Sequence, residues 1–175
     1  YLTTVMTEKA IEFLRATTAE QPFCLTVAFK EPHGPFNYFD PDAPNAYADA
    51  EIPPPRTFTR QDWETQPEFI RDSLNGSRSL AWLNRRETYQ QDMRTFYRTV
   101  TRADAAVGEI LEELRRLGLD DTTVVIFSSD HGSLLGDHGL SGKWLMYENS
   151  IRVPAIMSHP SRIPAGYVQE AMISS

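Results

Sequence analysis

An apolar run at residues 123–127 gives way abruptly to the polar sequence Ser-Ser-Asp-His-Gly at residues 128–132, and this change constrains the fold more than any other feature. The run is rich in β-branched residues and bounded by turn formers, which predicts a strand buried on both faces. Ligands of open α/β sheets bind just beyond the carboxyl ends of such strands. The sequence therefore predicts an α/β fold with a site at residues 128–132.

A second buried strand is predicted at residues 23–29, and helical patterns precede both strands. Apolar residues recur every three or four positions from Leu2 to Leu14 and again from about Glu87 to Leu117. Gly118 follows as a suitable C-cap. Alternation of helix and strand along the chain is typical of a parallel sheet covered by helices. We therefore expect a three-layer α/β sandwich with a mostly parallel sheet.

The segment at about residues 36–86 is predicted to be a long irregular excursion. The chain from 30 to 86 holds most of the prolines and shows no sustained periodicity. Loops of this length are usually functional or disordered, and this one carries enough apolar residues to pack down. We expect a folded flap beside the site. Because the chain begins at Tyr1 rather than at a methionine, we expect residues 1–175 to be an internal fragment of a longer protein.

Composition excludes several classes of function. Seventeen basic and 24 acidic residues among 175 give a net charge of -7, which argues against a nucleic-acid partner. No apolar stretch reaches the roughly 20 residues that a membrane span needs. The single cysteine, Cys24, cannot form an internal disulfide, so cysteine usage does not indicate a compartment.

The residue types at the predicted site suit a metal ion and an anion. Asp130 offers a hard oxygen ligand and His131 a nitrogen ligand, and Gly132 permits close approach of the backbone. Two ligands are too few for a complete site, and from the spacing alone a structural turn remains an equal alternative. Lys143, in the sequence Gly-Lys-Trp, could contact an anion that the metal also holds.

Further motifs lie on both sides of this site. Pro-His-Gly-Pro-Phe at 32–36 directly follows the second predicted strand, and Asp-Ala-Ala-Val-Gly at 104–108 lies in the long helical segment. Downstream are Gly-Asp-His-Gly at 136–139, Gly-Lys-Trp at 142–144, Tyr-Glu at 147–148 and Ile-Arg-Val-Pro at 151–154. In order and spacing, these motifs resemble the sulfatase family of the alkaline-phosphatase-like superfamily.

The resemblance implies a role for each matching residue. Asp130 and His131 match the second pair of calcium ligands of the family. Lys143 matches the lysine that contacts the sulfate and its bridging oxygen, and His33 matches the histidine that assists the leaving group, so both are implied catalytic and substrate-binding residues. The implied activity is calcium-dependent hydrolysis of a sulfate ester, on a sulfated small molecule or glycan. Relatives are commonly exported, which implies a periplasmic or secreted location.

Two elements of the family pattern are not visible in this sequence: the formylglycine motif, and the paired aspartates at a strand end before it that give the first calcium ligands. Sulfatases use a formylglycine made from a Cys/Ser-x-Pro-x-Arg motif, which we expect in the parent protein but not in this chain. Cys24 lacks the following proline and arginine and is interpreted as a core cysteine. Ser-His-Pro-Ser-Arg at 158–162 matches the short pattern but lacks its continuation, so we treat it as a coincidence. By this resemblance, residues 1–175 are expected to be a fragment of one sulfatase catalytic domain that is inactive on its own.

Two other functions remain open from the sequence. A phosphodiesterase or phosphonate monoester hydrolase of the same superfamily would also hold an anion with metal and lysine, and a non-catalytic relative would bind a sulfated glycan.

The remaining notable residues are expected to have structural roles. His138 is expected to face solvent, Arg85 and Arg86 to start a solvated helix, Glu148 and Arg152 to be structural, and Trp63, Trp82 and Tyr97 to be packing residues.

Overall fold

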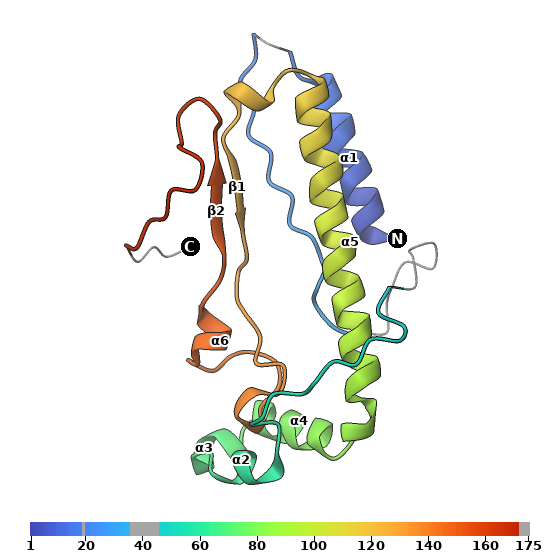
Figure 1. The fold of residues 1–175 in the computed structure, drawn as a ribbon, viewed down its shortest axis with the longest axis vertical. Helices are drawn as coiled ribbons and strands as arrows, with labels where there is room; N and C mark the ends of the chain where they lie inside the picture. The colour runs from blue at the N-terminus through green and yellow to red at the C-terminus, as the bar shows by residue number, and fades with distance from the viewer. Residues whose placement is uncertain (19, 36–45, 172–175) are drawn as a thin grey trace. The chain divides into compact units, whose positions relative to one another are not determined.

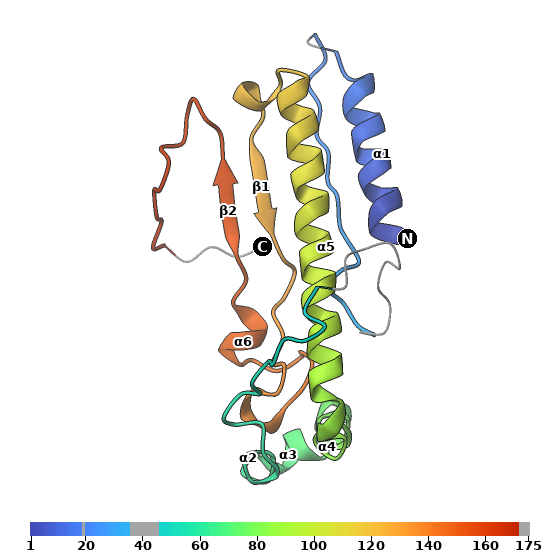
Figure 2. The same ribbon diagram turned by 45° about the vertical axis from the view of Figure 1, so that its right-hand side comes forward.

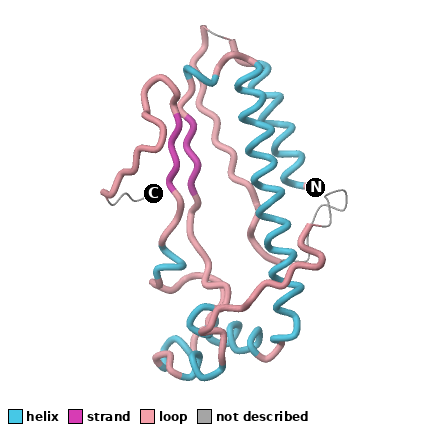
Figure 3. Tube along the Cα trace, in the orientation of Figure 1, coloured by secondary structure: helices cyan, strands magenta, loops and turns pink. Residues whose placement is uncertain are grey.

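The computed structural model describes residues 1–18, 20–35 and 46–171, and these fall into two compact units. The first unit comprises described residues within 1–51, 90–124 and 159–164. The second comprises those within 52–89, 125–158 and 165–175. Figures 1 and 3 show that helices outnumber strands among the described residues. None of the helices in these ranges is long and apolar enough to cross a membrane.

Two long helices dominate the first unit. Helix α1 (Leu2–Ala16) and helix α5 (Tyr89–Arg116) lie side by side in Figures 1 and 2, which confirms both helices predicted from apolar periodicity. The backbone N–H of Leu119 donates to the carbonyl oxygen of Leu114 at 3.0 Å, and Gly118 has a φ of +67°, so the expected glycine cap ends α5. The buried apolar residues among the described residues of this unit are Ala10, Leu14, Met93, Ala106 and Leu114.

The helix α5 also anchors the segment that precedes the second unit. Nε of Arg94 donates to the carbonyl oxygen of Ala50 at 2.8 Å, and Nε of Arg98 donates to that of Ala46 at 2.7 Å. This part of the predicted excursion therefore packs against α5, whereas residues 36–45 lie outside the described ranges.

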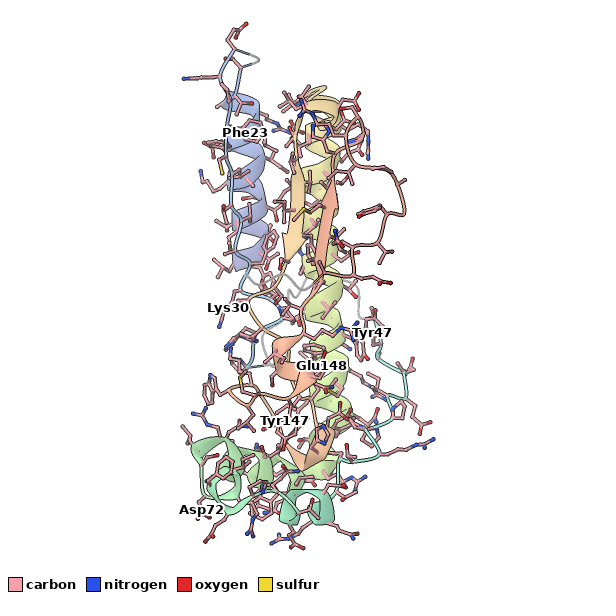
Figure 4. The ribbon with its side chains drawn as sticks, turned by 90° about the vertical axis from the view of Figure 1, so that its left-hand side faces the viewer. Phe23, Lys30, Tyr47, Asp72, Tyr147 and Glu148 are labelled. Atoms are coloured by element: carbon pink, nitrogen blue, oxygen red, sulfur yellow. The ribbon has the colours of Figure 1, made fainter. Side chains whose placement is uncertain are left out.

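The predicted strand at residues 23–29 is extended but belongs to no strand ladder among the described residues. Its residues alternate between half-buried and exposed, as a strand with one covered face would. The ring of Phe23, labelled in Figure 4, lies 6.1 Å from that of Phe13 on α1. The strand prediction is wrong in this respect because a ladder requires a neighbouring strand, and the described chain supplies none beside it.

The second unit contains the one ladder found in the described ranges. Strand β1 (Val125–Ser128) pairs antiparallel with β2 (Ala155–Ser158), with Ser128 opposite Ala155. The strand predicted at 123–127 is thus present, but it begins two residues later and ends one residue later. Two predictions about it fail: the sheet is antiparallel rather than mostly parallel, and Ile126 remains 62% exposed. The residues of β1 are half-buried to exposed, so neither face is covered as that of a buried central strand would be.

Short helices fill the rest of this unit. In the predicted excursion these are α2 (Arg60–Glu64), α3 (Glu68–Arg71) and α4 (Leu74–Leu83), and α6 (Glu148–Ile151) precedes β2. Indole Nε1 of Trp63 donates to the carbonyl oxygen of Gly76 at 3.1 Å. The helices pack against the loop after β1 through a buried cluster. Its members are Ile70, Leu134 and Leu140, joined by the half-buried Trp63, Leu145 and Tyr147.

Candidate functional site

Asp130 and His131 lie two and three residues beyond the end of β1. The hydroxyl of Ser129 donates to the carbonyl oxygen of His131 at 2.9 Å, and the backbone N–H of His131 donates to Oδ1 of Asp130 at 3.0 Å. These bonds fold the turn so that Oδ2 of Asp130 lies 3.5 Å from Nε2 of His131. The Asp130 side chain is 83% exposed, so its carboxylate is open to a ligand.

Lys143 reaches the same imidazole from the loop that follows. Its Nζ lies 2.5 Å from Nε2 of His131, while Nδ1 of His131 lies 2.8 Å from the carbonyl oxygen of Gly132. A carbonyl oxygen can only accept, so Nδ1 carries the proton and Nε2 presents a lone pair to the ammonium group. Three of the four residues predicted for the site therefore lie together in the second unit.

Gly132 fixes the turn to α6 through the main chain. Its N–H donates to the carbonyl oxygen of Ser150 at 2.8 Å. A Cβ at this position would lie 2.1 Å from the carbonyl oxygen of Asn149, far inside van der Waals contact. The expectation that glycine permits close backbone approach is confirmed, and the approaching group is the 149–150 main chain.

The loop that carries Lys143 is held by buried leucines and main-chain bonds. The N–H of Leu134 donates to the carbonyl oxygen of Gly142 at 2.8 Å, and that of Gly136 donates to Leu140 at 2.9 Å. Leu134 and Leu140 are fully buried. The ammonium group is consequently presented by a loop with a packed core rather than by a free surface segment.

His138, expected to face solvent, is half-buried and packs on an aromatic ring. Its ring stacks on Tyr147 with centroids 4.7 Å apart and an interplanar angle of 28°. The amide of Gln66 donates to the carbonyl oxygen of His138 at 3.0 Å and accepts from the hydroxyl of Tyr147 at 2.5 Å. Figure 4 shows Tyr147 on the loop that leads to Glu148 at the start of α6. The sequence analysis missed this packing role, because the contacts that His138 makes are not marked by any motif.

His33, the fourth predicted site residue, belongs to the first unit. It is exposed and follows the extended segment, with Nδ1 3.0 Å from Nζ of Lys30 and 2.6 Å from the carbonyl oxygen of Gly34. Its role in the site stays a prediction.

The donor atoms at this site fit a calcium ion only in part. Within the described ranges, no three His, Cys, Asp or Glu side chains gather closely enough to hold a metal ion. Asp130 and His131 supply one oxygen and one nitrogen donor, whereas Ca²⁺ takes roughly six to eight ligands, mostly oxygen. The pair fits part of a divalent-cation site that other residues would have to complete.

The structural interpretations of other residues have mixed outcomes. Cys24 is exposed, so its interpretation as a core cysteine is wrong. Trp82 packs against buried Phe58 with ring centroids 4.8 Å apart, as expected of a packing residue. Arg86 lies over the same ring, 5.6 Å from its centroid, and the ring of Tyr97 lies 5.6 Å from that of Tyr47.

Solved structures establish the class of fold. The chain matches a protein solved in complex with its substrate D-glucosamine-2-N,6-O-disulfate, with a TM-score of 0.71 and 24% identity over 95% of this chain and 44% of the other. It matches a putative sulfatase from Bacteroides fragilis with a TM-score of 0.63 and 27% identity over 93% of this chain and 32% of the other. The fold is that of part of an alkaline-phosphatase-like hydrolase.

Sequence comparison defines the family within that class. The sulfatase family model matches residues 1–175, and the chain belongs to the sulfatase family. It is 28% identical to the N-acetylglucosamine-6-O-sulfatase of Bacteroides thetaiotaomicron, over 98% of this chain and 40% of that protein. It is 31% identical to the choline-sulfatase of Rhizobium meliloti, over 83% of this chain and 28% of that protein. The chain thus spans less than half the length of these relatives.

Proposed function

We propose that this chain forms part of a calcium-dependent sulfatase that hydrolyses a sulfate ester on a carbohydrate. The observation that carries the proposal is the convergence of Asp130, His131 and Lys143 beyond β1, in a chain that belongs to the sulfatase family. The parent fold proposed for the whole protein is the three-layer sandwich with a mostly parallel sheet.

Asp130 and His131 are the proposed calcium ligands in this chain. Nε2 of His131 is suited to this because Nδ1 is engaged by the carbonyl oxygen of Gly132, which fixes the tautomer and the ring orientation. Bound calcium would offset the negative charge of the sulfate oxygens. The carboxylate of Asp130 contributes a hard, exposed oxygen to the same ion.

Lys143 is the proposed sulfate-binding residue. Because its Nζ already lies 2.5 Å from the nitrogen proposed to bind calcium, a sulfate next to that ion would be within reach of the ammonium group. A fixed positive charge there stabilises the negative charge that develops on the bridging oxygen as the S–O bond breaks. The compact ammonium group suits such an oxyanion.

His33 is the proposed proton donor to the leaving alcohol. An imidazole can act as a general acid if it comes within hydrogen-bond distance of the bridging oxygen. The exposed position of His33, after the extended segment 23–29, leaves its ring accessible. The nucleophile of the proposed reaction is a formylglycine of the parent protein, outside these residues, so we expect no turnover from this chain alone.

The carbohydrate substrate is proposed from the relatives. These include the N-acetylglucosamine-6-O-sulfatase and an endo-4-O-sulfatase of Bacteroides thetaiotaomicron, 28% and 31% identical to this chain. The solved structure with a TM-score of 0.71 to this chain holds a sulfated glucosamine as its substrate. A second candidate is phosphoester hydrolysis, because the chain is also 27% identical to a multifunctional alkaline phosphatase superfamily protein of Trinickia caryophylli.

Assays of the full-length protein test these proposals. The protein, produced together with a formylglycine-generating enzyme, would be assayed on matched sulfate and phosphate esters, with calcium and with a chelator. We expect chelator-sensitive hydrolysis that strongly favours the sulfate ester. A preference for the phosphate ester would establish the second candidate, and binding of sulfated glycans without hydrolysis of either ester would indicate a non-catalytic relative. Robust sulfatase activity of residues 1–175 alone would contradict the proposal that the nucleophile lies outside these residues.

A further inference from the structure

Trp144, the residue after Lys143, is an exposed indole held in an unusual backbone conformation. It is 63% exposed and has a φ of +77°, in the left-handed region that side chains rarely adopt. Residues in such conformations persist where the surrounding structure fixes them, and they cluster at ligand sites. A tryptophan that served only the core would bury its ring, so its exposure here calls for another explanation.

Arg78 on α4 lies over this indole. Its Cζ is 5.4 Å from the ring centroid, within the range of a cation–π contact. Arg78 is exposed, and the ion pairs found within the described ranges do not include it. The planar guanidinium group is therefore available to bind a carboxylate or sulfate through two parallel hydrogen bonds.

Packing holds Trp144 and Arg78 in place relative to each other. On the loop, Leu145 packs against the buried cluster on one side of Trp144. On the helix, the hydroxyl of Ser79 accepts a hydrogen bond from the N–H of Ser141 at 2.9 Å, which ties α4 to the loop. These contacts hold the loop and α4 together beneath the two exposed side chains.

Trp144 is also close to the proposed sulfate-binding group. The Cα atoms of residues 143 and 144 are about 3.8 Å apart across their peptide bond. An ester sulfate held by Lys143 would therefore place the sugar that carries it within reach of the indole. A flat aromatic face suits the apolar face of a sugar ring, and the tip of an arginine beside it suits a charged substituent.

We propose that Trp144 and Arg78 form a carbohydrate subsite beside Lys143. The indole stacks on the sugar that bears the ester sulfate, and Arg78 binds a second anionic group, a sulfate or a carboxylate, of the same substrate. This subsite rests on the proposed function, because Lys143 must hold the ester sulfate.

The test compares three kinds of substrate on the full-length protein, with released sulfate as the readout. These are an acyclic alkyl sulfate, a monosulfated hexosamine, and sugars with a second anion, either a disulfated hexosamine or a sulfated uronate disaccharide. Trp144→Ala should raise KM roughly tenfold for every sugar substrate but leave the alkyl sulfate unchanged. Arg78→Gln should raise KM roughly tenfold only for sugars with a second anion. The two doubly charged sugars show whether that anion is a sulfate or a carboxylate.

Arg86→Gln is the matched control, because Arg86 lies over the buried ring of Phe58 in a pair of the same kind. Equal losses on all three kinds of substrate, or no effect of either variant, would overturn the subsite. Calorimetric binding of the same sugars separates the two proposals. If Trp144→Ala binds the sulfated sugars as tightly as the wild type does, the subsite alone is overturned. If the wild type neither binds nor hydrolyses these sugars, the proposed function is overturned as well.

Discussion

Nζ of Lys143 lies 2.5 Å from Nε2 of His131, so one lone pair of the imidazole accepts the hydrogen bond of a cationic side chain. A metal ion bound through Nε2 would need the same lone pair. Lys143 would then have to turn toward another acceptor, and a sulfate next to the ion is the acceptor that its charge suits best. The contact therefore links the proposed metal ligand and the proposed sulfate-binding residue.

Removal of the Lys143 charge should separate these two roles. In the full-length protein, Lys143→Met should lower kcat/KM for a sulfate ester roughly 100-fold or more, because a charge that stabilises the transition state is lost. Calcium affinity, measured by calorimetry, should be unchanged or higher, because Nε2 of His131 loses its competing donor. Lys9→Met, which removes an exposed lysine paired with Glu12 on α1, is the control and should alter neither quantity. An equal loss of calcium affinity and activity in Lys143→Met would contradict this assignment.

Asp130→Ala should weaken the binding of calcium by the full-length protein. Second-sphere and ligand changes at metal sites typically reduce affinity by about 10-fold to 100-fold. The half-maximal calcium concentration for activity should rise by at least that factor, and excess calcium should restore part of the activity. Asp72→Asn removes an acid at the end of α3 and should leave the calcium titration unchanged. Activity that is insensitive to calcium in both wild type and Asp130→Ala would refute the assignment.

Gly132→Ala should destabilise the turn that holds Asp130 and His131. Its Cβ would lie 2.1 Å from the carbonyl oxygen of Asn149, so main chain has to move, at a cost of roughly 1–3 kcal/mol. Chemical denaturation measures this loss. The control is Gly108→Ala on α5, where no atom beyond the adjacent residues and the local helix backbone lies within 4 Å of the added methyl group. That variant should gain roughly 0.5–1 kcal/mol from helix propensity, so a similar effect of both substitutions would show that the contact at 132 is unimportant.

Glu113 should make the first unit sensitive to acid. Hydrogen bonds from Arg116 and then Arg15 lower the pKa of this carboxyl from 4.5 to about 2. Because the folded pKa lies below the unfolded value, the stabilisation is fully present above about pH 4.5 and is lost as the pH falls toward 2. Glu113→Gln should flatten the dependence of stability on pH in that window, measured by thermal unfolding. The neighbouring Glu112→Gln, in an exposed pair with Arg115, should change the profile little, and identical profiles for wild type and Glu113→Gln would exclude this role.

The helices could be predicted from sequence because their signals are local. The apolar stripe that ends at Leu117 and the glycine after it define α5 without any knowledge of its neighbours, and the cap at Gly118 has the expected conformation. The turn at Asp130 and His131 was predictable for the same reason, since a β-branched run followed by polar residues marks the end of a strand.

Features that depend on distant partners could not be predicted. The segment 23–29 has the composition of a strand, but its ladder depends on what lies beside it, which the sequence does not state. The packing of His138 depends on Tyr147 and on Gln66, 72 residues away. The exposed pair of Trp144 and Arg78 joins a loop and a helix that the hydrogen bond from Ser141 to Ser79 holds together, and no motif marks that contact.

The pairing of Ser128 with Ala155 closes the chain between them into a single loop, and Asp130, His131 and Lys143 all lie within it. Both ends of this loop are secured by the same short ladder. A substitution that opened this ladder would therefore release both ends of the loop at once, and with them the turn at Asp130 and His131.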